Sequence, residues 1–102
     1  MTDVELAAFR ERVEWLRDEF PAELPVHVHR VPFAKRLGDA TKHDGHFLIR
    51  VAKRLPFSEA VYALFEEFAH CLEWDDTHDH GPAWAAAYGE IIRADEARDT
   101  EG

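Results

Sequence analysis

Three side chains that can bind a metal ion or transfer a proton lie close together in this sequence: Glu66, Glu67 and His70. A fourth, His80, comes ten residues after His70. Imidazole nitrogens and carboxylate oxygens both bind zinc, and a neighbouring carboxylate can take a proton from metal-bound water. In a helix, Glu66 and His70 project from the same side one turn apart. The pattern therefore predicts two ligands on one helix, a carboxylate beside them and a third ligand downstream.

The segment around these residues has the pattern of a helix with one apolar face. That face comprises Val61, Leu64, Phe65, Phe68 and Leu72. Ser58 is of a type that caps helices, so we expect the helix to begin there and to run to about Trp74. His70 lies nearly opposite the centre of the apolar face. The helix is therefore expected to bury one side in a core and to present Glu66, Glu67 and His70 on the other.

A second motif, His80-Gly81-Pro82-Ala83-Trp84, predicts how the downstream histidine reaches the first helix. Proline suits the first position of a helix, so a last helix is expected from Pro82 to about Ala94. Residues from about 95 to 102 are polar and are expected to fray. A histidine directly before this helix has no evident packing purpose. A short turn would bring its ring back over the preceding helix.

The remaining elements predict an α+β domain that includes all of residues 1–102. Residues 3–20 have the apolar periodicity of a helix, and prolines follow it. Val26 and Val28 alternate with histidines, which indicates a strand, whereas residues 33–45 indicate either an extended segment or a loop. Asp44-Gly45 predicts a tight turn, and the alternation in Phe47–Val51 predicts a further strand.

Composition and charge exclude several classes of protein. The chain of 102 residues has a formal net charge of −9, which argues against a nucleic-acid binder because such proteins present a basic surface. Its single cysteine, Cys71, excludes an internal disulfide or a cysteine zinc cluster. No apolar run has the length of a membrane span, and the acidic first residues lack a signal-peptide pattern. We therefore expect a cytoplasmic protein that does not enter a membrane.

Residues 47–93 resemble the minimal zincin-like proteins related to the SprT-like zinc metallopeptidases. The resemblance rests on the strand, on Glu67-Phe68-Ala69-His70 and on His80-Gly81-Pro82-Ala83-Trp84. It implies that His70 and His80 bind zinc, that Glu67 is the general base and that the substrate is a protein or peptide. It also implies that the strand Phe47–Val51 is an edge strand, along which an extended substrate pairs.

Glu66 departs from the family pattern, in which the sequence H-E-x-x-H has histidine at this position. A carboxylate can also bind zinc, so Glu66 can complete a ligand set with His70 and His80. Two histidines and a carboxylate also suit iron or manganese. An alternative is that Glu66 marks a lost metal site in a catalytically inactive zincin-fold module that binds another protein. A third possibility is an α+β domain without a metal site, whose helix has an ordinary polar face.

Other candidate residues have simpler explanations. His78 can replace His80 as a ligand, but a hydrophilic loop with Asp79 capping the last helix is the favoured interpretation. His27 and His29 share one strand face and can bind a metal, although surface positions are favoured. Cys71 is expected to be a small core residue.

Overall fold

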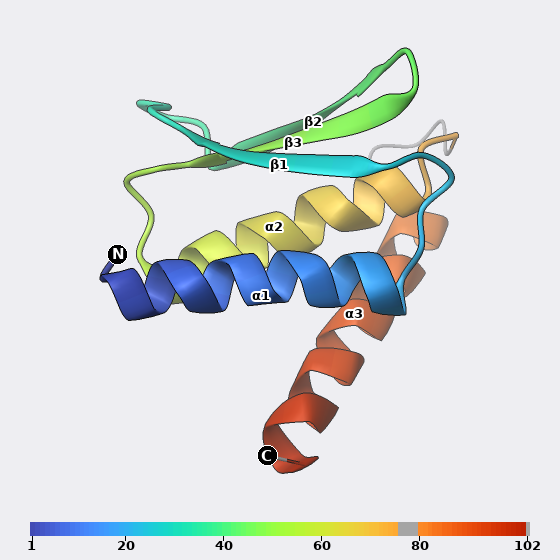
Figure 1. Cartoon of the computed structure of the whole chain (residues 1–102). Coiled ribbons are helices and arrows are strands. Elements are labelled where there is room, and N and C mark those ends of the chain that lie inside the picture. Colours follow the sequence, from blue (N-terminus) through green and yellow to red (C-terminus); the bar gives the residue numbers. More distant parts are fainter. Residues whose placement is uncertain (76–79, 102) are drawn as a thin grey trace.

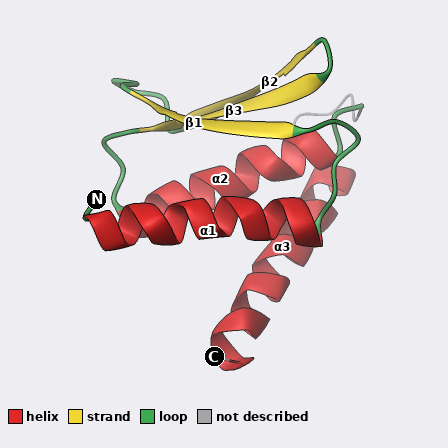
Figure 2. Cartoon of the chain, viewed as in Figure 1, coloured by secondary structure: helices red, strands yellow, loops and turns green. Residues whose placement is uncertain are grey.

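The computed structural model describes residues 1–75 and 80–101. His78 and Asp79 therefore lie outside the described residues. Within them the protein is an α+β domain with three helices and a three-stranded sheet (Figure 2). The elements are α1 (Asp3–Glu19), β1 (Val26–Val31), β2 (Gly38–His43), β3 (His46–Ala52), α2 (Phe57–Leu72) and α3 (Pro82–Glu101). None of the described helices combines the length and apolar character needed to cross a bilayer.

The sheet has the order β1-β3-β2, with β1 parallel and β2 antiparallel to β3. Ile49 in the middle of β3 lies between Val28 of β1 and Ala40 of β2. The expectation that Phe47–Val51 is an edge strand is therefore wrong. Its main-chain groups pair with a strand on each side and are not available to a substrate.

β2 is the strand that sequence patterning left undecided. Gly38–His43 pairs with β3 through the Asp44-Gly45 turn, and Gly45 adopts φ +81°, a conformation that favours glycine. The six residues of β2 include no large apolar side chain. The alternation of apolar and polar residues that identifies a strand is consequently weak here.

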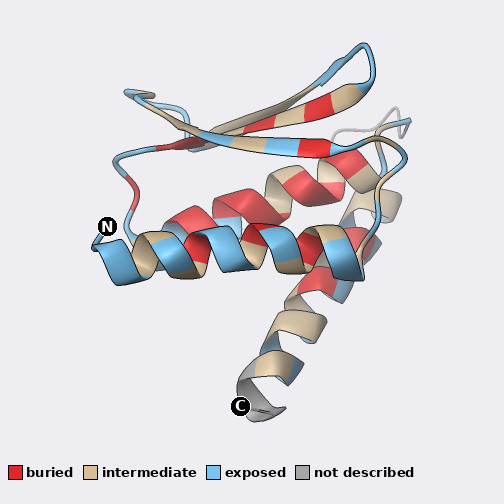
Figure 3. Cartoon of the chain, in the orientation of Figure 1, coloured by how far each residue is buried: buried red, intermediate tan, exposed pale blue. Residues whose placement is uncertain are grey.

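The core lies between one face of the sheet and the helices α1 and α2 (Figures 1 and 3). β3 directs Phe47, Ile49 and Val51 inward, and all three are fully buried. α2 meets them with Phe65 and Phe68, also fully buried. Because α2 buries one whole side beneath the sheet, its polar residues are confined to the two margins of that contact.

The helix starts illustrate two kinds of capping. Thr2 caps α1, and a capping box joins its hydroxyl and main-chain N–H to Glu5. α2 instead begins at Phe57, with Pro56 as the N-cap residue and no side-chain cap hydrogen bond. The prediction of Ser58 as the cap is wrong. Proline fixes φ near its helix-compatible value, and the helix starts directly after it.

α3 continues to Glu101, beyond the expected end of the last helix near Ala94. Asp95 accepts a hydrogen bond from Arg12 Nε at 2.8 Å, which attaches α3 to α1. Arg98 makes an ion pair with Glu11, and its guanidinium lies 4.6 Å from the ring centre of Trp15. The polar composition of this segment thus serves contacts between helices.

Candidate functional site

His70 and His80 come together in the structure, as the second motif predicted. His70 is on α2 and His80 precedes α3, and their ring centres are 5.0 Å apart with planes at 27°. Two imidazoles that bind one zinc through nitrogens at about 2.0–2.1 Å have ring centres roughly 5 Å apart. The separation of the two rings therefore fits a shared ion. His80 adopts φ 55°, a left-handed conformation that is unfavourable for a residue with a side chain.

Trp84 of α3 lies against both histidines and is hydrogen-bonded to the main chain of α2. Its ring lies 4.2 Å from the ring of His80 and 5.5 Å from that of His70. Its indole Nε1 donates a hydrogen bond of 3.1 Å to the main-chain carbonyl of Glu66. Tyr88 stacks on Trp84 with ring centres 5.1 Å apart. This aromatic ladder fixes the start of α3 against the turn of α2 that carries the predicted ligands.

The two carboxylates lie toward different neighbours. A Cβ atom built on Gly38 would lie 3.5 Å from Glu67 Cγ and 3.7 Å from its Oε2, so Glu67 lies against the start of β2. Glu66 lies on the α3 side, because its main-chain carbonyl accepts the hydrogen bond from Trp84. Burial raises the pKa of Tyr88 on the same helix, and the charge of Glu66 raises it further. Glu67 thus faces the sheet edge, while Glu66 faces the aromatic ladder.

Glu67 also affects the neighbouring thiol. Cys71, one turn further along α2, is only 2% exposed. Burial raises its pKa to about 12, and the negative charge of Glu67 contributes to the increase. The thiol is therefore protonated at neutral pH and is a poor nucleophile. The prediction of a small core residue is confirmed.

Gly38 is a site residue that sequence analysis missed. A Cβ atom at this position would lie 2.8 Å from the carbonyl oxygen of Arg50, closer than side chains approach a neighbouring main chain. Glycine therefore permits β2 to lie close to β3 directly above Glu67. Nothing in the local sequence distinguishes this glycine from one in a loop.

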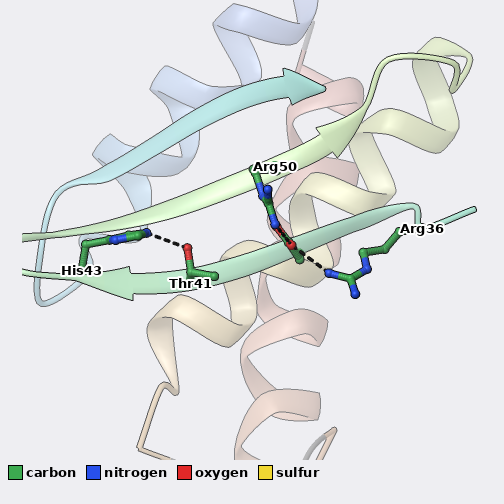
Figure 4. A network of polar contacts seen from close by, with 5 residues as sticks. Arg36, Thr41, His43 and Arg50 are labelled. Atoms are coloured by element: carbon green, nitrogen blue, oxygen red, sulfur yellow. Dashed lines mark hydrogen bonds and ion pairs between the residues drawn. The ribbon is translucent and has the colours of Figure 1, made fainter. Parts of the chain in front are cut away.

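The next residues hold β2 in place on the outer face of the sheet. Asp39 lies opposite Arg50 and accepts hydrogen bonds from Arg50 Nε at 2.8 Å and from Arg36 at 3.0 Å (Figure 4). The hydrogen bonds from Arg50, followed by its charge and the contacts with Arg36, hold the pKa of Asp39 below its ordinary value. Asp39 therefore stays ionised at neutral pH and links the two strands next to Gly38.

The outer edge of β2 carries main-chain groups that a further strand can pair with. Ala52 N donates to the Leu37 carbonyl at 2.9 Å, which makes these two residues a hydrogen-bonded pair. In an antiparallel ladder, such pairs alternate with residues whose main-chain groups point away from the partner strand. Gly38, Ala40 and Lys42 consequently direct their N–H and C=O groups to the outer edge. This edge begins beside Glu67.

A complete three-donor metal site is not formed by the described residues. Within residues 1–75 and 80–101, no group of three or more His, Cys, Asp and Glu side chains lies closely enough to hold an ion. His70 and His80 are thus the part of the expected ligand set that is assembled. The assignment of Glu66 as the third ligand stays a prediction.

A second histidine cluster lies on the outer face of the sheet. The ring of His46 is 4.9 Å from that of His27 and 5.0 Å from that of His43, on which it stacks. His43 Nε2 shares a hydrogen bond of 2.9 Å with the Thr41 hydroxyl (Figure 4). The strand pairing therefore brings both His27 and His43 against His46, so that His27 has a histidine neighbour besides His29 on its own strand.

Comparisons of the chain with protein families, with curated proteins and with solved structures find no match.

Proposed function

We propose that this protein is a zincin-like metalloprotein with a peptidase site. His70 and His80 bind the metal ion, Glu66 completes the ligand set, and Glu67 is the general base. The observation that carries the proposal is that His70 of α2 and His80, which precedes α3, have rings 5.0 Å apart beside the helix that also carries Glu66 and Glu67. Zinc is the favoured metal, and two histidines with a carboxylate also suit iron or manganese.

When bound, the ion supplies an acidified water and polarises the substrate carbonyl. Glu67 would act as the general base, holding the proton released on hydrolysis and donating it to the leaving amine. Its position against Gly38 supports this role, because a carboxylate beside the sheet edge lies where a bound peptide would run. Glu66 adds negative charge close to the ion, which makes the ion a weaker Lewis acid than one held by neutral ligands alone.

The substrate in this proposal is an extended peptide that pairs with the outer edge of β2. Gly38, Ala40 and Lys42 offer main-chain donors and acceptors, and strand addition of this kind needs no particular side-chain sequence. The assignment of the peptide edge thus moves from Phe47–Val51 to β2. The free, buried thiol of Cys71 is compatible with the reducing environment of the cytoplasm, where we place this activity.

A second candidate function is a catalytically inactive module that binds peptides at the same edge. It is favoured by the absence of a three-donor group among the described residues and by the glutamate at position 66. Under this alternative, the His70–His80–Trp84 stack serves only to pack α3 on α2.

Metal content distinguishes the two candidates. The protein is purified without chelator, and metals are quantified by inductively coupled plasma mass spectrometry. If the proposal holds, the unmutated protein retains about one ion per chain. His70→Ala is expected to lose this ion, because His80 is then the only histidine left at the site. His46→Ala is the matched control, since it removes one imidazole from the other cluster. Absence of stoichiometric metal from the unmutated protein contradicts the metalloprotein proposal and leaves the peptide-binding module.

A further inference from the structure

A groove of about 420 Å³ runs between α1 and β1, at the sheet edge opposite β2. Figure 1 is viewed from this side, with β1 above α1. Its apolar lining comes from Leu6, Phe9 and Val13 of α1 and from Val28 of β1. Its volume is within the range of roughly 300–1,000 Å³ in which proteins bind ligands.

The charge of this groove is opposite to that of the whole protein. Four cationic side chains line it, together with one carboxylate, although the chain has a net charge of −9. The cations are Arg10, Arg17, Arg30 and Lys53. Arg10 and Lys53 are exposed, and within the described residues neither side chain makes a hydrogen bond or an ion pair. Two cations at the rim are therefore available to an anionic partner.

The main chain of β1 provides a second recognition element in the groove. The carbonyl of Pro25 accepts a hydrogen bond from Phe47 of β3, and that of Val31 accepts one from Lys53, directly after β3. The carbonyl of Val26 instead accepts from Arg17 Nε at 2.9 Å. Residues with odd numbers thus direct their main-chain groups toward β3, and those with even numbers direct them outward. Val28 and Arg30, which line the groove, consequently present N–H and C=O groups at a free sheet edge.

We propose that this groove binds an extended acidic peptide, which adds a strand to β1. The peptide main chain pairs with Val28 and Arg30, and its carboxylates lie against Arg10 and Lys53. An extended segment with alternating acidic and apolar residues matches both features of the groove. This surface is distinct from the β2 edge, so the proposal does not depend on the peptidase site.

The test uses a fluorescein-labelled six-residue peptide of alternating glutamate and valine. Its binding to the full chain is followed by fluorescence anisotropy at low salt, with protein concentrations up to about 1 mM. A short, unoptimised strand is expected to bind with a Kd of about this size. The double variant Arg10→Glu/Lys53→Glu is expected to weaken binding at least about tenfold, because it places like charges against the peptide. A peptide with proline at the central valine is also expected to bind at least about tenfold more weakly, since proline lacks the N–H that a strand pair requires.

Matched controls separate this groove from other surfaces. Lys35→Glu/Arg93→Glu changes the net charge equally at exposed positions outside the groove, and it is expected to leave the affinity within about twofold. An equal loss in this control shows general charge attraction and overturns the proposal. If Arg10→Glu/Lys53→Glu binds the peptide as tightly as the unmutated protein, the peptide binds at another edge, such as β2. This result also overturns the proposal. Equal binding of the proline peptide excludes strand addition, and absence of binding excludes the site.

Discussion

The protein has two histidine clusters whose ring separations are nearly the same but whose surroundings differ. His70 and His80 lie 5.0 Å apart between two helices, beside Glu66, Glu67 and an indole. His46 lies 4.9 Å from His27 and 5.0 Å from His43 on the open face of the sheet. Proximity of imidazoles is therefore not what distinguishes a candidate site. The helical cluster differs because it has carboxylates at its margins and a sheet edge next to one of them.

Glu67→Gln provides the largest expected contrast between the two clusters. If Glu67 is the general base, its amide replacement lowers the rate of peptide hydrolysis by about 10² to 10⁴-fold, the usual contribution of a positioned base. Cleavage of an unstructured fluorogenic peptide by metal-loaded protein measures the rate. His46→Gln in the other cluster is expected to leave the rate unchanged. Equal rates for Glu67→Gln and the unmutated protein would remove Glu67 from the chemistry.

Gly38→Ala tests whether the sheet edge beside Glu67 depends on close approach of the strands. The added Cβ would meet the Arg50 carbonyl at 2.8 Å, and a main-chain atom cannot move aside cheaply. We expect a loss of about 1–3 kcal/mol in the free energy of unfolding, measured in urea. Gly89→Ala is the control, because its Cβ would meet only the end of the Arg93 side chain in α3. That variant is expected to gain roughly 0.5–1 kcal/mol through helix propensity.

Glu66→His tests the position at which the helical cluster departs from the H-E-x-x-H pattern. A third neutral imidazole would complete the usual zinc ligand set, so we expect zinc affinity to rise by about tenfold or more. Competition with a chromophoric chelator measures the affinity. The same substitution combined with His70→Ala is expected to lose the gain. Unchanged affinity would show that position 66 does not direct its side chain to the ion.

Cys71 makes the free energy of unfolding of the protein sensitive to alkaline pH. The unfolded thiol loses its proton near its ordinary pKa of 9.0, whereas the folded thiol keeps it up to a pKa of about 12. Between these values the unfolded state is favoured progressively, so stability falls by at most about 1.4 kcal/mol per pH unit. Urea unfolding at pH 8, 9 and 10 measures the slope. Cys71→Ala is expected to give a shallower slope, and an unchanged slope would assign the pH dependence to other groups.

Much of the fold was predictable because apolar periodicity reports directly on burial. Phe47, Ile49 and Val51 alternate along β3, and Phe65 and Phe68 recur on one side of α2, so both elements were expected in these places. β2 and the second half of α3 were not predicted in their observed form. Their residues are small or polar, and the interactions that order them come from β3 and α1.

The sequence alone determined which residues share a helix face and that a histidine returns over that helix. Local geometry decides both, since helical spacing places Glu66 and His70 one turn apart and Gly81-Pro82 starts a new helix directly after His80. Only the tertiary structure decided which strand is the edge, because strand order depends on long-range pairing. For the same reason, it alone placed Glu67 against Gly38 and brought His27 to His46. The chemistry of the candidate site was thus encoded locally, while the surface that could present a substrate to it arose from packing between distant segments.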